Sequence, residues 1–411
     1  MSTVELTVFA SVLTQPRQLQ AIFKDSDKHR KAPANNSGWY MDQLLGKCVG
    51  LISGRAWRSV RTVAEVPFTH QAVSQLVPLV ERHVDEHFKY LHTTSDMDRG
   101  LIHAAQDTKM LPFWVVSEVF YGRLPPDLHR ELSDLVPLRE RVFQHVIYGG
   151  LPRFAWSGWL LTAANAQLRE FKQRWRAFNQ QVIEHARKDI AKAPIVSMYE
   201  ATVSGMLSEE QLLHTLDESL YANLDVTTGG LSWNLVFLAA HPHVQTRLRN
   251  EVEEAHRLGV LRTYLLSRDT HLAACVLESS RLKPLAAFSV PQAAPTAREV
   301  DGYIVPANTS FIVDAYALNI RNEAWAPDNT AFRPDRFLGK REGDRRYLFW
   351  RFGFGPRQCM GKYLADLIIR TTLAHLVLNY ELSLIDDGVW KRSRESWITH
   401  PDVQLQCVKR T

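Results

Sequence analysis

Ten residues near the carboxyl end of the chain, 352–361, constrain its fold and chemistry more than any other segment, and they read FGFGPRQCMG. Their cysteine, Cys359, lies between glycines, which let a backbone approach a bound group closely and adopt positive φ. A helix expected to begin near Met360 would turn free N–H groups and its positive dipole end toward the sulfur. Arg357 adds a cation that can pair with an acidic group. This pattern predicts a cysteine that binds as a thiolate.

Two alternative interpretations, a structural cysteine and a dinucleotide-binding loop, explain the segment less well. A buried structural cysteine, the usual role of a single Cys, accounts for neither the glycines nor the arginine. A dinucleotide-binding loop needs G-x-G-x-x-G, but Gly353 and Gly355 are followed by Gln358 where the third glycine belongs. A role in ligand binding through the sulfur therefore remains the better interpretation.

A zinc site has little support. His83 and His87 are four residues apart, but Val84 stands where the H-E-x-x-H motif needs its glutamate, so we interpret the pair as part of a polar helix face. The chain has no C-x-x-C pair. Its cysteines are too few for a disulfide framework and favour a reducing compartment. They are Cys48, Cys275, Cys359 and Cys407.

Length and charge favour one large enzyme. The 411 residues exceed the usual size of a single core, yet no linker, charge block or internal repeat divides them. The net charge of +5 is modest and the basic residues are scattered among acids, which argues against a nucleic-acid partner.

The pattern F-x-x-G-x-R-x-C-x-G in residues 352–361 resembles the haem-thiolate loop of the cytochrome P450 family. The resemblance implies haem b (iron protoporphyrin IX) with Cys359 as its axial metal ligand, a propionate contact from Arg357, and Phe352 shielding the sulfur from water. Thiolate ligation pushes electron density onto iron and favours O–O cleavage. The implied activity is a haem-thiolate monooxygenase that hydroxylates or oxidatively couples a small molecule with electrons from NADPH.

The hydrophobic pattern agrees with the fold that the resemblance implies, which is mainly α, with a large helical haem domain and a small β-rich part. Apolar residues recur at helical spacing over 76–91, 170–188, 209–240, 244–255, 272–282 and 361–378. Short strands are expected at 302–305, 310–313, 382–384 and 403–408.

Two further motifs match the family. Glu278 and Arg281 form E-x-x-R on one helix face, and Arg336 is expected to join them in a cluster that supports the haem pocket. Taken alone, the first pair could equally be a solvated surface pair. Trp57 and Arg61 form W-x-x-x-R, and the resemblance assigns both to a haem propionate. By itself that pair would read as a half-buried tryptophan beside a surface arginine.

The helix over 209–240 is expected to cross the distal side of the haem. The family pattern A/G-G-x-D/E-T-T aligns with ANLDVTT, residues 222–228. In this alignment Asp225 matches the acid and Asn223 replaces the glycine. Val226 stands where the first threonine, which helps to deliver protons, belongs, and Thr227 matches the second. Asp225, with Thr227, is therefore the candidate catalytic set. Alternatively, the carboxylate and hydroxyls bond only within the helix.

The front of the chain is short for the family. Residues 1–11 are too few to span a bilayer and lack a basic leader. Residues 12–23 resemble a strand end followed by a helix. The expectation is one haem domain over 1–411 without the membrane anchor, hinge and first helix and strands, either naturally or in a truncated gene. It would be cytoplasmic or peripheral at the endoplasmic reticulum surface, where membrane contact stays open.

The segments expected over the haem suggest a medium-sized, partly aromatic substrate. They are 285–291 and 34–51, the latter contributing Trp39 and Tyr40. The sequences of residues 222–233 and 269–272 resemble those of fungal enzymes of secondary metabolism. These include enzymes of mycotoxin pathways and enzymes that act on amino-acid-derived diketopiperazines.

The electron donor implied by the resemblance is NADPH-cytochrome P450 reductase. A basic cluster before the cysteine loop is a candidate docking face, although a solvated loop explains it equally well. It comprises Lys340, Arg341, Arg345, Arg346 and Arg351. Two other functions stay open. One is a haem-thiolate isomerase, dehydratase or peroxide-dependent enzyme without O₂ activation, and the other is a non-catalytic haem-binding or misfolded product of a shortened gene.

Overall fold

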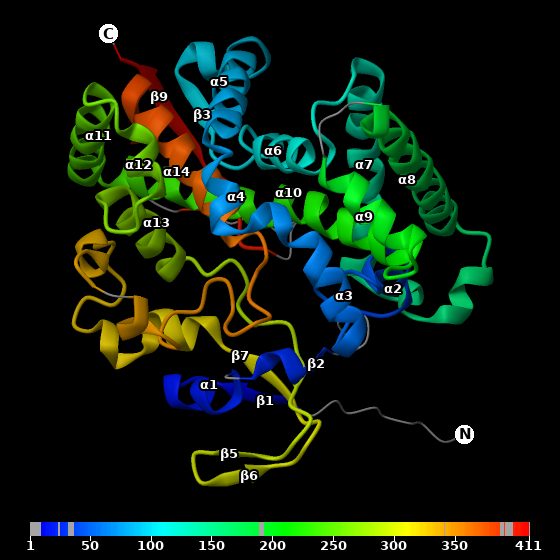
Figure 1. The fold of residues 1–411 in the computed structure, drawn as a ribbon. Coiled ribbons are helices and arrows are strands. Elements are labelled where there is room, and N and C mark those ends of the chain that lie inside the picture. The colour runs from blue at the N-terminus through cyan, green and yellow to red at the C-terminus, as the bar shows by residue number, and fades with distance from the viewer. Residues whose placement is uncertain are drawn as a thin grey trace.

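The computed structural model describes residues 10–23, 25–31, 37–188, 193–340, 342–386, 390 and 398–410. One long helix, α10 (Glu209–Ala240), crosses the middle of the molecule (Figure 1). Its first turn carries a capping box, in which the Ser208 side chain and that of Gln211 each bond the other residue's backbone N–H. Most of its residues are buried on all sides, so α10 is the central element on which other helices pack.

The other helices surround α10 (Figure 1). In chain order they are α1 Pro16–Phe23, α2 Trp39–Leu45, α3 Gly54–Ala64, α4 His70–Ser74, α5 Val77–Thr94, α6 Met110–Tyr121, α7 Pro126–Tyr148, α8 Ala163–Lys188, α9 Pro194–Val203, α11 Pro242–Arg257, α12 Leu261–Leu266, α13 His271–Leu282 and α14 Lys362–Asn379.

The strands form three small sheets. A four-stranded sheet has the order β1-β7-β4-β2, a three-stranded sheet the order β3-β9-β8, and β5 pairs with β6. The strands are β1 Ala10–Leu13, β2 Arg30–Lys31, β3 Leu101–His103, β4 Gln292–Ala293, β5 Arg298–Val300, β6 Tyr303–Val305, β7 Ser310–Val313, β8 Tyr380–Leu384 and β9 Gln404–Lys409.

The predicted mainly helical architecture is confirmed, and each predicted helix and strand lies within a few residues of an observed one. Six helices were not predicted: α2, α4, α6, α7, α9 and α12. In α6 almost every residue is buried, so the sequence carries no amphipathic period. In α7 the proline at 137 interrupts the helical pattern.

The front of the described chain pairs with a segment far along the sequence. Strand β1 runs parallel to β7, with Leu13 opposite Val313, and α1 follows directly. The expected strand end and helix in residues 12–23 are therefore confirmed. Leu13, Phe23 and Val313 belong to a separate small core beneath the cysteine loop. Residues 1–9 lie outside the described part.

Candidate functional site

The cysteine loop is held in a tight turn by its own backbone. The Cys359 N–H donates to the carbonyl of Phe352 at 2.8 Å. Gly355 has φ of +70°, and a Cβ there would lie 2.7 Å from the Phe23 carbonyl oxygen, so this position requires glycine. Helix α14 begins at Lys362, immediately after the loop. The loop therefore presents Cys359 at the beginning of a buried helix, as the sequence predicted.

Cys359 is the only cysteine with an exposed side chain, since the other three are buried. The protein encloses its sulfur on most sides, and this burial raises the pKa of the thiol above its ordinary value. The Gly361 N–H and the charge of Arg61 act in the opposite direction on that pKa. A coordinated metal ion deprotonates a thiol outright, so the same surroundings suit a metal-bound thiolate better than a free one.

A buried arginine lies beside the loop with part of its hydrogen-bonding capacity unused. Arg357 donates from Nη2 to the Ile52 carbonyl at 2.7 Å, and its guanidinium stacks 4.8 Å from the Trp57 ring centroid. Its Nη1 is buried and has no hydrogen-bond partner among the residues that the structure describes. Burial, together with the nearby charge of Arg61, lowers the pKa of Arg357 to about 10.

Two further cations adjoin Arg357. Arg61 bonds the Gln358 carbonyl at 3.0 Å and pairs with Glu65 at 2.5 Å. Burial and the charge of Arg357 lower the pKa of Lys31 to about 7. The sequence analysis missed Lys31, because a lysine in the basic run KHRK (28–31) reads as a solvated surface residue. Three gathered cations with an unsatisfied buried donor fit a doubly anionic group such as the two haem propionates.

Phe352 is packed under a neighbouring cation. The Arg351 guanidinium lies 4.4 Å from its ring centroid and pairs with Asp366 on α14 at 2.5 Å. Arg351 is largely buried, so it is not a free cation for docking a partner. Arg341 of the expected docking cluster lies outside the described residues.

The expected Glu278 cluster is confirmed; Glu278 and Arg281 are fully buried and Arg336 is mostly buried. Arg281 donates from Nε and Nη2 to Glu278 at 2.7 and 2.8 Å, and Arg336 reaches the same carboxylate at 3.0 Å. Arg281 also bonds the carbonyls of Asn319 and Asn329. The solvated-pair alternative is therefore wrong, because the cluster fastens the loop before Cys359 to α13.

A cavity of about 440 Å³ lies beside α10. Asp225 and Val226 line it, whereas the Thr227 hydroxyl donates to Asn223 Oδ1 at 2.5 Å and is not in the lining. His400, which the sequence analysis missed, also lines the cavity. Its Nε2 lies 2.6 Å from the Asp225 carbonyl oxygen and 4.0 Å from Asp225 Oδ1.

The two segments expected over the haem, 285–291 and 34–51, both line this cavity, but neither Trp39 nor Tyr40 is among the lining residues. Residues 34–36 lie outside the described part, but Met41, Leu51 and Val290 line the cavity. The expected contribution of Trp39 and Tyr40 is wrong: Tyr40 is buried, and its hydroxyl donates to Asn165 on α8.

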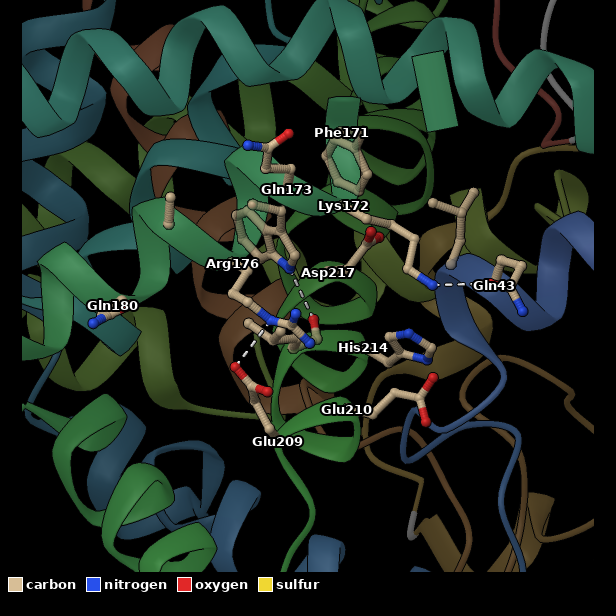
Figure 2. A pocket seen from close by; sticks show the side chains of 14 residues that line it. Gln43, Phe171, Lys172, Gln173, Arg176, Gln180, Glu209, Glu210, His214 and Asp217 are labelled. Atoms are coloured by element: carbon tan, nitrogen blue, oxygen red, sulfur yellow. Dashed lines mark hydrogen bonds and ion pairs between the residues drawn. The ribbon is translucent and has the colours of Figure 1, made fainter. Parts of the chain in front are cut away.

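A second cavity, of about 610 Å³, lies between α2, α8 and the start of α10 and shares no lining residue with the first (Figure 2). Its charged groups are largely paired within the wall, since Arg176 pairs with Glu209 and Lys172 donates to Gln43. Burial, together with the charges of Lys172 and other nearby cations, lowers the pKa of His214 there to about 4. We assign the chemistry to the first cavity, because Asp225 lies in its wall.

Comparison with known proteins identifies the family from nearly the whole chain. The cytochrome P450 family model matches residues 8–407. The chain belongs to the cytochrome P450 family. The P450 is 54% identical to the cytochrome P450 monooxygenase aclC of Aspergillus oryzae, over 97% of this chain and 82% of that one. It is 51% identical to the cytochrome P450 monooxygenase asaD of Aspergillus flavus, over 97% and 78%.

The fold agrees with this membership. The crystal structure of a cytochrome P450, CYP102L1, matches with a TM-score of 0.79 at 19% identity, covering 97% of this P450 and 92% of that chain. The expected family, fold and monooxygenase activity are thereby confirmed, and haem-thiolate iron follows from the family. Among the described residues, none of the helices of this P450 combines the length and apolarity needed to cross a membrane.

Proposed function

We propose that this cytochrome P450 binds haem b through Cys359 and oxidises a small, amino-acid-derived secondary metabolite of the diketopiperazine type. The carrying observation is the accessible Cys359 next to Arg357, whose buried Nη1 has no hydrogen-bond partner in the described part of the chain. When bound, the haem supplies iron at which dioxygen is activated and one oxygen atom is transferred. The following roles belong to the protein's own residues.

Cofactor binding divides between a ligand and an anion pocket. Cys359 would supply the thiolate, and the gathered cations Arg357, Arg61 and Lys31 would hold the propionates by charge-assisted hydrogen bonds. Trp57 supports the Arg357 guanidinium from below. Phe352 shields the sulfur. These assignments give every buried cation beside the loop an anionic partner.

Proton supply is proposed for Asp225. Its neighbour Val226 lines the cavity and has no hydroxyl, and the Thr227 hydroxyl is committed to Asn223. His400 donates its Nε2–H to the Asp225 carbonyl, which makes the ring a brace for this turn of α10. The sequence-based assignment of Thr227 is thus better limited to orienting Asn223.

The proposed substrate class rests on the cavity and on the sequence resemblance of residues 222–233 and 269–272. A volume of about 440 Å³ suits a small ligand that is mostly enclosed. The wall combines apolar residues such as Leu45 and Phe143 with a few polar groups. Electrons are proposed to come from NADPH-cytochrome P450 reductase.

The test is spectroscopic. The haem-loaded, reduced carbon monoxide complex should show the red-shifted Soret band of thiolate ligation, and Cys359→Ala should lose it because no other cysteine lies at the loop. Cys407→Ala, which removes a buried thiol on β9, is the matched control and should keep the band. A histidine-type spectrum in the unmodified protein would contradict the proposal. An isomerase or peroxide-dependent enzyme would instead turn over without consuming NADPH and O₂.

A further inference from the structure

One carboxylate in the cavity beside α10 accepts hydrogen bonds from a backbone N–H and from a thiol. Glu218 lies two turns before Asp225 on the same face of α10, and both line the cavity. Its Oε2 accepts from the Gly50 N–H at 3.0 Å. A Cβ at position 50 would lie 1.9 Å from Glu218 Oε1. Glycine at this position is therefore what lets the carboxylate take up its place.

The cations in the cavity wall are already neutralised by other acids. Arg139 makes a two-pronged pair with the buried Asp217 at 2.7 to 3.0 Å. Lys109 forms an ion pair with Glu140. Neither cation is therefore available as the main counter-charge of Glu218.

The other cations near Glu218, Lys31 and Arg357, belong to the proposed cofactor pocket. Lys31 is close enough to favour the charged form of Glu218, while burial raises the pKa of this carboxyl. We have assigned Lys31 to a haem propionate, which would compete for its charge. The Cys48 thiol also hydrogen-bonds to this half-buried carboxylate. Together with the Gly50 N–H it leaves acceptor capacity unused on a carboxylate that is open to the cavity.

We propose that Glu218 anchors the substrate by accepting a hydrogen bond from an N–H group. This inference rests on the proposed function and narrows its substrate class to molecules with an amide or amine N–H directed at α10. The hydrogen bond fixes which carbon of the ligand faces the reacting centre, so Glu218 determines specificity rather than taking part in bond breaking.

Two probes that differ only in N–H groups test this role. They are the cyclic dipeptide of glycine and phenylalanine and its N,N′-dimethyl derivative, each titrated into the haem-loaded protein while the Soret shift is followed. A hydrogen bond to a charged group is worth about 1.5–3 kcal/mol, so the unmodified protein should bind the N–H probe at least about tenfold more tightly.

Two variants then remove the anchor by different routes. Glu218→Leu deletes the acceptor, and Gly50→Ala displaces it while keeping its charge; both should abolish the preference for the N–H probe. Gln144→Leu alters another polar side chain of the same wall without freeing a cation, and should leave the preference unchanged. The carbon monoxide spectrum of each variant reports whether the haem pocket is intact.

The possible outcomes distinguish failure of the Glu218 anchor from failure of the proposed substrate class. If both probes bind the unmodified protein equally, or if the preference survives in Glu218→Leu and Gly50→Ala, the anchor is wrong while the proposed substrate class stands. If Glu218 serves only as a counter-charge for Lys31, the variants change stability but not the ratio of the two affinities, which also overturns the anchor. If neither probe shifts the spectrum of the unmodified protein, the proposed substrate class fails and the anchor fails with it.

Discussion

Single residues decide how protons reach the distal side of this P450. Val226 occupies the position where the family pattern has a hydroxyl, and Thr227, about 100° further round the helix, is bonded to Asn223. Asp225 lines the cavity, and His400 holds the carbonyl of the same residue. We therefore propose that the acid and its brace, rather than a threonine, define the local proton route.

We expect Asp225→Asn to slow coupled turnover by about 10²–10⁴, the usual contribution of a positioned general acid. Val226→Thr should retain or improve the coupling of NADPH to product, because it restores a hydroxyl in the cavity wall. The measurement is NADPH consumption, peroxide release and product formation on both variants. Intact coupled turnover in Asp225→Asn would show that Asp225 is not on the proton path.

At the scale of elements, the cysteine loop depends on a helix distant in sequence. Helix α13 contributes Glu278 and Arg281, which are completely buried, and Arg336 brings the preceding loop onto them. A carboxylate shared by two arginines is favourable only while all partners are present, since a buried charge left unpaired is costly. The cluster therefore couples folding of the loop to docking of α13.

Glu278→Gln should destabilise the protein by roughly 3–5 kcal/mol, because it leaves two arginines without their counter-charge in the interior. Glu254→Gln provides the control, since Glu254 and Arg257 have the same spacing on an exposed surface, where ion pairs contribute little to stability. Thermal unfolding of the haem-loaded proteins measures both changes. Equal, small losses of stability would contradict the scaffold role.

At the scale of the whole molecule, charge and burial affect partner binding and acid stability. Of the described cations in the expected docking cluster, Arg351 is ion-paired and Arg345 lies against the Phe337 ring. Lys340 and Arg346 are exposed and remain the better candidates for contact with an acidic partner.

Elsewhere, His214 is buried within the wall of the second cavity.

Charge reversal at the docking face should slow reduction by the reductase. Lys340→Glu with Arg346→Glu weakens the attraction of an acidic partner, and the defect should shrink at high salt because screening removes the steering. Lys89→Glu, at an exposed position on α5, should not slow reduction. Stopped-flow reduction rates across salt concentrations provide the measurement, and identical rates in all variants would remove this face from consideration.

Acid should destabilise the fold partly through His214. Burial and nearby cations lower its pKa from 6.5 to about 4. The unfolded chain then binds the proton more readily, so stability falls as pH drops from about 6.5 toward 4, by on the order of 3 kcal/mol at 1.36 kcal/mol per unit. His214→Gln should flatten this fall in denaturant midpoints, whereas the exposed His256→Gln should not. An unchanged slope in His214→Gln would contradict this assignment.

The sequence by itself determined the cysteine loop, the E-x-x-R cluster and the amphipathic helices, because each depends on residues close together in the chain or on a regular period. It could not reveal α6, whose apolar residues face the core on every side.

Only the tertiary structure brought Lys31 to Arg357, His400 to Asp225 and Gly50 to Glu218. Those contacts join segments that are distant in the chain, and no local pattern marks their partners. Burial then changed their chemistry: it turned an ordinary basic run into a pocket for an anion and an ordinary helix glutamate into a constrained acceptor.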